Sequence, residues 1–491
     1  MGGPAPELVE GAYKVELEGG PRLAVALSSA DLAHALALAE GGGIDAATAT
    51  ALLDGLLALD AIPPEDVPWR PELGDPFNSR EALLTERVGR SAAGWLSAGR
   101  PRREAFRVAL RLVARESALD LHDVSLALAD ALCGLAGPLV DAVAADYTYL
   151  QPAQPTTAAH LLLAYAAPAL RDAERLRAAH ARLDRSVAGV GGSAGSRWPL
   201  DRARLAELLG CEGLEVHAKD AMWQTDPYLE LASAVAIATA GWSQLGQDLE
   251  IMASQEFGWV ELADAHSRAS ALMPQKRNPY ALAAVRTEAG AAAGQVVSML
   301  VALHTGSART DHFHLLNGEL PRSLDRAVGV GRLLVAVVEG LRVDADRLAV
   351  AAREGFVTAA DVADLVAEQP GMDYRTAHKV VGRAVRDIVE SGGRPDELTA
   401  DRIAGAAAEV ADAEVRLDPA ALARALDPAE CARTRRQRGS SAPGEVTGML
   451  TEMGGRVTEG RAWSAGARAR AEGAAARLRG LAATRAAAPV T

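Results

Sequence analysis

Hydrophobic positions recur along this chain at the spacing of α-helices. Apolar residues alternate with charged faces over residues 102–135 and 156–187, and Pro168 predicts a kink in the second segment. Residues 228–256 and 279–304 are rich in Ala, Leu, Val and Ile on most faces. A helix that is apolar nearly all round must be buried nearly all round. The pattern predicts a mainly α-helical protein, an elongated bundle of long helices that other subunits complete.

Shorter helices are predicted near the beginning of the chain. Ser28 and Asp31 resemble a capping box at the start of one helix, which the glycine-rich residues 41–44 end. Residues 45–59 then predict a second helix. The two together form a helical hairpin.

The pattern changes again in the final third. From about Asp344, short helices alternate with glycine- and proline-containing turns, and residues 465–491 predict a helix that frays into a tail. We therefore divide the chain into an N-terminal helical domain (1–104), a central long-helix bundle that carries oligomerisation and the active site (105–343), and a C-terminal helical domain (344–491).

Composition and charge narrow the function. Hydrophobic residues make up 49% of the 491 and aromatic residues only 4%, so Ala, Leu and Val must build the core. The net charge of -13 argues against a nucleic-acid surface. Cys133, Cys211 and Cys431 are isolated, which indicates a reducing compartment without disulfides or a thiolate metal site.

No targeting or membrane segment is predicted. Residues 1–20 lack both a basic start and an apolar stretch, and the best apolar run, 229–245, contains Glu230 and Gln244. We expect a soluble cytoplasmic protein with no membrane contact.

Two short motifs do not predict a cofactor. GVGGSA at 189–194 fits a dinucleotide-binding pattern but follows a helical segment, so we interpret it as a flexible loop that faces a ligand. DHFH at 311–314 could align two imidazoles, but no third ligand stands at a recognisable spacing. No metal and no cofactor are predicted.

The stretch SRASALMPQKRNP, residues 267–279, predicts a mobile loop. Its small residues pack little, and Pro274 ends any helix that reaches it. Lys276 and Asn278 offer a positive charge and an amide, which suit a carboxylate. Taken alone, the stretch also fits an ordinary solvated turn.

Four motifs in order resemble argininosuccinate lyases, within the aspartase/fumarase superfamily. Together they are far more specific than any one of them, and the similarity extends from about Ala24 to Val446. The motifs are LTERVG (84–89), TYLQPAQPTTAAHLLLAY (148–165), GWVELADAHSRASALMPQKRNP (258–279) and EGFVTAADVADLVAEQPGMDYRTAHKVVGRAV (354–385).

The resemblance implies a fold, an assembly and a reaction. It implies a helical homotetramer whose long helices form a bundle of four subunits, with each active site assembled from three chains and without a cofactor. The family reaction is an anti β-elimination from a small carboxylate substrate. A base removes a proton beside a carboxylate, a doubly charged aci-carboxylate forms, and an amine leaves; fumarate is the usual product.

The same resemblance assigns roles in the 267–279 loop. The family loop carries its base in the first serine of G-S-S-x-M-P-x-K-x-N, which aligns with Ser270. Lys276 and Asn278 match the carboxylate grip, and positive charge there suits a dianionic intermediate. Ala269 and Ala271 replace the flanking glycine and the second serine.

A second motif departs further from the family. Where argininosuccinate lyases have T-H-L-Q, this chain has Thr148, Tyr149 and Gln151 around Leu150, so a tyrosine replaces the proton-relay histidine. The histidine's usual glutamate partner falls at Ala283. Loss of both members indicates a coherently remodelled site.

The sequence leaves two candidates for the general acid. Tyr149 stands where the histidine was and carries a phenolic proton. The alternative is that Tyr149 fills the space, and His160 or a histidine of residues 311–314 donates the proton instead.

The substrate contacts also differ from the family. GRPRREA replaces GRSRNDQ and keeps Arg102, while Arg103 stands in place of a substrate-binding asparagine. Asp311, Leu316 and Glu319 replace a Tyr, a Gln and a Lys that hold the amino-acid end of the substrate. We predict a C–N lyase with a succinyl-like substrate other than argininosuccinate. The alternative is a non-catalytic binding or structural homologue.

Overall fold

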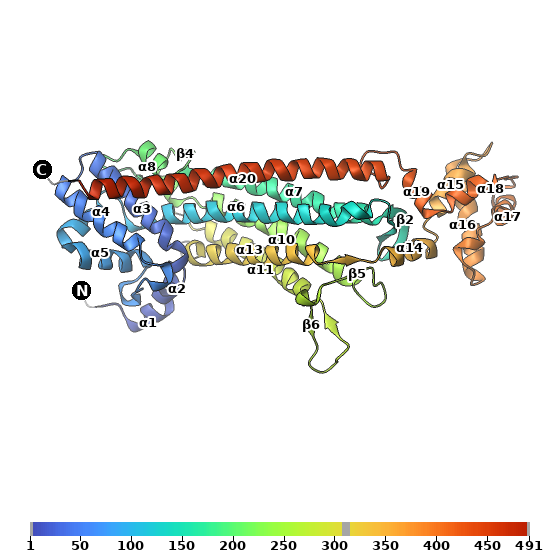
Figure 1. Cartoon of the computed structure of the whole chain (residues 1–491), viewed down its shortest axis with the longest axis horizontal. Helices are drawn as coiled ribbons and strands as arrows, with labels where there is room; N and C mark the ends of the chain where they lie inside the picture. Colours follow the sequence, from blue (N-terminus) through green and yellow to red (C-terminus); the bar gives the residue numbers. More distant parts are fainter. Residues whose placement is uncertain (1–2, 307–314, 489–491) are drawn as a thin grey trace.

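The computed structural model describes residues 3–306 and 315–488. The molecule is elongated, with a small group of helices at each end of a bundle of long helices (Figure 1). The mainly α-helical, elongated architecture predicted from the hydrophobic pattern is confirmed.

Five long helices form most of the bundle. They are α6 (Arg102–Ala136), α7 (Ala158–Leu183), α10 (Asp226–Met252), α11 (Tyr280–Leu303) and α13 (Leu320–Glu339). Small and branched residues such as Ala166, Leu231 and Val285 are fully buried between them, because a core poor in rings needs closely spaced helices. Helix α7 continues through Pro168.

The N-terminal helices correct one prediction. They are α1 (Pro6–Leu8), α2 (Lys14–Leu17), α3 (Gly20–Glu40), α4 (Ala46–Asp60) and α5 (Pro76–Ala93). Helix α3 begins before Ser28, which lies inside it with Asp31, and both are buried. Asp31 accepts a hydrogen bond from Arg100 at 2.6 Å, and Arg80 donates to Ser28 at 2.9 Å. The capping box is therefore wrong, because these polar side chains bind buried guanidinium groups.

Helix α3 is also long and apolar enough to span a membrane, and it is the one such helix among the described residues. Its most apolar window is 83% buried inside the molecule. This burial is typical of a core helix in a large helical domain.

A compact group of short helices has its own core at the other end. Val362, Val380 and Ile403 are fully buried there. The helices are α14 (Ala345–Glu354), α15 (Ala359–Ala367), α16 (Tyr374–Glu390), α17 (Ala400–Ala411), α18 (Pro419–Ala425) and α19 (Pro428–Arg433).

The last helix, α20 (Pro443–Ala486), begins well before the helix predicted over residues 465–491. It runs back along the bundle to the N-terminal helices (Figure 1). Val457 lies in the bundle core and Leu478 in the N-terminal core. The boundaries at 104 and 343 stay predictions, and this packing favours ending the third domain before Pro443.

Short helices and strands connect these elements. The short helices are α8 (Arg202–Leu208) and α9 (Ala218–Trp223). The antiparallel pairs are β1 (Val143–Thr148) with β2 (Gln151–Thr157), β5 (Val260–Glu261) with β8 (Arg342–Val343), and β6 (Arg268–Ala269) with β7 (Arg277–Asn278). One parallel pair joins β3 (Arg185–Ser186) to β4 (Gly213–Leu214). Thr156 was predicted to start the second long helix, but it lies within β2, and α7 begins at Ala158.

Candidate active site

The predicted base and carboxylate grip lie on one hairpin. Strands β6 and β7 carry it away from the bundle (Figure 1). Ser270 N donates to Lys276 O at 3.2 Å, so these two residues face each other just beyond the paired strands. Asn278 Nδ2 donates to Arg268 O at 2.9 Å. The amide of Asn278 thus closes the stem of the hairpin.

The hydroxyl of Ser270 is surrounded by hydrogen-bond donors. Leu272 N and Met273 N donate to Ser270 Oγ at 3.3 and 3.0 Å. Donors to an oxygen stabilise that oxygen's negatively charged form. The backbone of the turn therefore favours the deprotonation that a catalytic serine base needs.

Ion pairs fix the foot of this hairpin to the bundle. Arg277 donates to Glu261 Oε1 at 2.9 Å and lies 2.6 Å from Asp264 Oδ1. Glu261 also binds Arg342 on β8. Hydrogen bonds from Arg342 and Arg277 hold the pKa of the Glu261 carboxyl below its usual value. The foot is thus anchored while residues 271–276 are exposed.

Tyr149 lies at the tip of the β1–β2 hairpin. It and Leu150 form a two-residue turn with φ of 53° and 57°, a left-handed conformation that non-glycine residues rarely adopt. Thr148 and Gln151 pair directly across the turn. The side chain of Tyr149 is 100% exposed. The strained turn therefore holds the exposed Tyr149 side chain away from the rest of its own chain.

His160, one of the candidate acids, is already bonded on both ring nitrogens. Its Nε2 lies 3.1 Å from the carbonyl of Gly439, which accepts only, so Nε2 carries a proton. Its Nδ1 lies 3.0 Å from Thr156 Oγ1. His160 therefore joins the start of α7 to the loop before α20.

Arg102 and Arg103 lie at the other end of α6. Arg102 pairs with Asp75 at 3.1 Å. Burial raises the pKa of Asp75, and the charge of Arg102 opposes that rise. The guanidinium of Arg103 lies 5.6 Å from the ring centre of Trp223, and burial lowers its pKa.

The structure does not bring all predicted residues together within one chain. Helix α6 has 35 residues, so its ends are about 50 Å apart at 1.5 Å per residue. Arg102 begins this helix, and Tyr149 follows its far end. Residues so far apart can meet in one site only between copies of the chain.

The residues that replace the family's contacts to the amino-acid end of the substrate lie in different environments. Leu316 is buried in the bundle core, and Glu319 pairs with Arg322 at 3.2 Å. Leu316 is thus a packing residue in this chain. Asp311, with the histidines of residues 311–314, lies outside the described residues.

The glycine-rich stretch 189–194 has an internal partner on α6. Gly189 N and Gly191 N donate to the two carboxylate oxygens of Glu104 at 2.6 and 2.7 Å. Glu104 is fully buried, which raises its pKa, and these hydrogen bonds oppose the rise. The start of the loop is thus fixed to α6, and the ligand-facing role of the exposed residues 193–195 stays a prediction.

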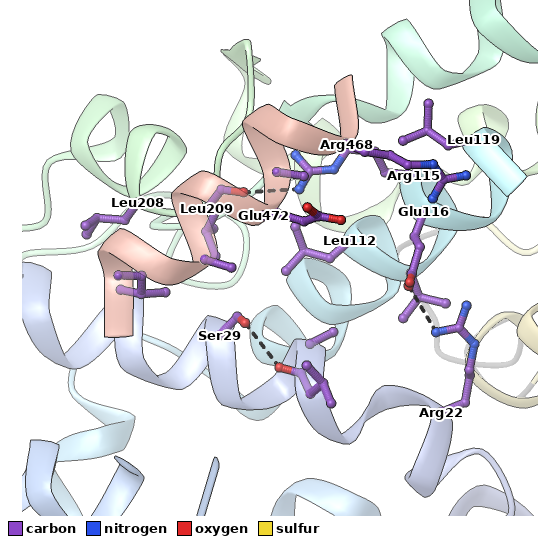
Figure 2. A pocket seen from close by; sticks show the side chains of 16 residues that line it. Arg22, Ser29, Leu112, Arg115, Glu116, Leu119, Leu208, Leu209, Arg468 and Glu472 are labelled. Carbon is purple, nitrogen blue, oxygen red and sulfur yellow. Dashed lines mark hydrogen bonds and ion pairs between the residues drawn. The ribbon is translucent and has the colours of Figure 1, made fainter. Parts of the chain in front are cut away.

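A cavity of about 310 Å³ lies between α3, α6, α8 and α20 and contains none of the predicted site residues (Figure 2). Its arginines already have carboxylate partners. Arg22 pairs with Glu116 at 3.2 Å, Arg115 with Asp184 at 2.7 Å, and Arg468 with Asp120 at 2.8 Å. These pairs leave little positive charge for a ligand.

Metal ligands are not grouped in the part of the chain that the structure describes: no three His, Cys, Asp or Glu side chains there are placed to hold one ion. Cys133, Cys211 and Cys431 are free thiols.

Comparison with known proteins identifies families and relatives that this sequence resembles. Residues 74–294 match the family described as Lyase, and residues 356–433 match the one described as Argininosuccinate lyase C-terminal. Argininosuccinate lyase of Methanoculleus marisnigri is 34% identical over 88% of this chain and 87% of its own. That of Thermus thermophilus is 36% identical over 75% and 80%.

Solved structures agree with the sequences. EDDS lyase in complex with formate is 26% identical, with a TM-score of 0.86 over 99% of this chain and 96% of that one. A variant of EDDS lyase with bound fumarate is equally similar, at a TM-score of 0.86. By its motifs, its helical fold and its relatives, this chain belongs to the argininosuccinate lyase family.

Proposed function

We propose that the chain is a C–N lyase that catalyses anti β-elimination from a succinyl-like carboxylate and releases fumarate and an amine. The observation that carries the proposal is Ser270, whose oxygen accepts two backbone hydrogen bonds opposite Lys276. The names of the relatives and the fumarate bound to an EDDS lyase variant support the same reaction.

Each residue has a step in this reaction. Ser270 takes the proton from the carbon next to the substrate carboxylate, and its two N–H donors stabilise the alkoxide that acts as the base. Lys276 stabilises the negative charge that then develops on the carboxylate. Tyr149 donates a proton to the departing nitrogen, since both nitrogens of His160 are used internally.

The proposed enzyme is a homotetramer in which three chains build each site. Support comes from α11, whose outer face is apolar and uncovered in one chain: Val297 and Val301 are 61% and 65% exposed. Gly290 and Gly294, on the same helix, are also exposed. Small residues at this spacing let a helix of a second chain approach closely, and burial of the valines would stabilise that contact.

The proposed leaving group is cationic or lacks an α-carboxylate. Arg103 adds positive charge where the family has an asparagine, and Glu319 replaces a lysine. Like charges or unpaired groups in a pocket cost several kcal/mol, so argininosuccinate should be cleaved negligibly, at most about a thousandth as fast as the preferred substrate. Efficient release of arginine and fumarate from argininosuccinate would overturn this preference.

A substrate panel tests the reaction. Purified protein is given N-succinyl amines and N-succinyl amino acids, and fumarate is followed by ultraviolet absorbance and identified by mass spectrometry. We expect fumarate from at least one member. The reverse reaction, fumarate with a panel of amines, provides a second readout. If a broad panel gives no product in either direction, the proposal is contradicted.

A further inference from the structure

An aromatic cavity lies at the base of the β1–β2 hairpin, apart from the residues assigned to the elimination. It has a volume of about 530 Å³, which suits a small molecule. Tyr147, Phe257 and Trp259 line it. The ring centre of Trp259 lies 5.0 Å from that of Tyr147 and 4.6 Å from that of Phe257, with interplanar angles of 58° and 67°. Trp259 is buried, whereas Tyr147 and Phe257 are half-buried, so these two rings offer most of the aromatic surface to the cavity.

Three acidic side chains line the same cavity: Glu256, Asp346 and Glu354. In the described part of the chain, none of them has an ion pair or a side-chain hydrogen bond. All three of these side chains are exposed. Carboxylates next to aromatic rings provide the two attractions that an organic cation needs.

Arg347 is the one cationic side chain among the described residues that line the cavity. Its guanidinium packs on Gly258, where an added Cβ would lie 2.1 Å from Nη1. It is also 3.9 Å from Asp344, outside the cavity lining. Three carboxylates against one guanidinium leave the lining net negative, which disfavours an anion.

We propose that this cavity binds an alkylammonium ion, with the rings against its alkyl groups and the carboxylates near its charge. A neutral ligand would gain no attraction from the three carboxylates, and the described residues offer no three-ligand group for a metal. Tyr147 pairs with Pro152 across the β1–β2 ladder, next to the turn that carries Tyr149. The site is therefore adjacent to the catalytic hairpin, but its occupancy does not depend on the elimination reaction.

Tetramethylammonium is the probe for this test. The full-length protein is titrated with its chloride, and tryptophan fluorescence and thermal stability are recorded. Neopentyl alcohol is the uncharged probe of similar shape, and sodium chloride controls for ionic strength. We expect a saturable response to tetramethylammonium only. Absence of saturation, or an equal response to the alcohol, overturns the proposal.

Charge-removing variants localise the binding. The double variant Asp346→Asn with Glu354→Gln keeps the shape of the cavity, and we expect it to weaken tetramethylammonium binding at least about fivefold. The matched control, Asp396→Asn with Glu368→Gln, changes exposed carboxylates elsewhere and should bind as the wild type does. Equal affinity of the cavity variant and its control would show that the probe binds elsewhere, and the proposal would fall.

Discussion

The two hairpins that carry candidate site residues hold them in different ways. The β1–β2 hairpin pairs five residue positions across its ladder and ends in a two-residue turn with Tyr149 at its tip. The β6–β7 hairpin pairs only two, and its exposed loop from Ala271 to Lys276 has few other bonds. One hairpin fixes the backbone that carries Tyr149, and the other leaves an exposed segment free to move on an anchored foot.

This difference matches the proposed chemistry. An acid on a rigid turn can wait in a fixed position within a neighbouring subunit's site. A serine base must be shielded from water when it loses its proton, so it belongs on a loop that closes over bound substrate. Leu272, 84% exposed at the loop tip, has the apolar character of a residue that is covered on closure.

The largest expected effect comes from the mobile hairpin. Ser270→Ala removes the proposed base and should lower turnover by about a thousandfold or more, the range of acid–base catalysis. Ser267→Ala is the matched control, because the hydroxyl of this neighbouring serine donates to the carbonyl of Ala263 and not to the exposed loop. If both variants turn over substrate alike, Ser270 is not the base.

Removal of the charge opposite the base should have the next largest effect. Lys276→Ala is expected to reduce turnover by about a hundredfold or more, because the dianionic intermediate loses its nearest cation. It should also abolish thermal stabilisation by fumarate or succinate. Lys379→Ala, an exposed lysine on α16, is the control. Stabilisation that survives in Lys276→Ala would place the carboxylate elsewhere.

On the rigid hairpin, Tyr149→Phe deletes one oxygen and keeps the ring. We expect turnover to fall by about a hundredfold with substrate binding unchanged, which is the signature of a lost general acid. Steady-state kinetics with binding measured separately distinguishes this from a packing defect. Near-normal turnover would reduce Tyr149 to a space-filling residue.

The smallest effect concerns the strain in the same turn. Leu150→Gly should raise the free energy of unfolding by about 0.5–1 kcal/mol, because glycine adopts its φ of 57° without a steric penalty. Leu481→Gly, at an exposed position inside α20, should lower the same free energy by about 1 kcal/mol. Chemical denaturation measures both. A destabilised Leu150→Gly would show that the turn is not strained.

The sequence predicted the long helices well, because their apolar faces repeat over many turns. Helix α6 begins at the predicted Arg102 and ends one residue beyond the predicted Leu135. The start of α20 and the capping of α3 were mispredicted, since a long helix with alternating Ala, Gly and Arg shows little periodicity, and Ser28 binds a distant arginine.

For the candidate site, the sequence indicated residues and their spacing but not their geometry. The spacing of Ser270 and Lys276 indicated a shared loop, yet only the fold shows the two donors to Ser270 Oγ. The partner of Glu104 lies more than eighty residues away in the chain, so no local pattern could reveal it. The anchoring role of Arg277 was missed for the same reason: its partners are on other elements.

Subunit complementation tests the central claim, that Ser270 and Tyr149 from different chains act in one site. Ser270→Ala and Tyr149→Phe are each purified, then unfolded and refolded together in equal amounts, with mixed assemblies confirmed by native mass spectrometry. In a randomly mixed tetramer, about a quarter of the sites receive both native residues. We predict recovery toward about a quarter of wild-type turnover, far above either parent variant. Mixed assemblies that stay as inactive as their parents would contradict the account.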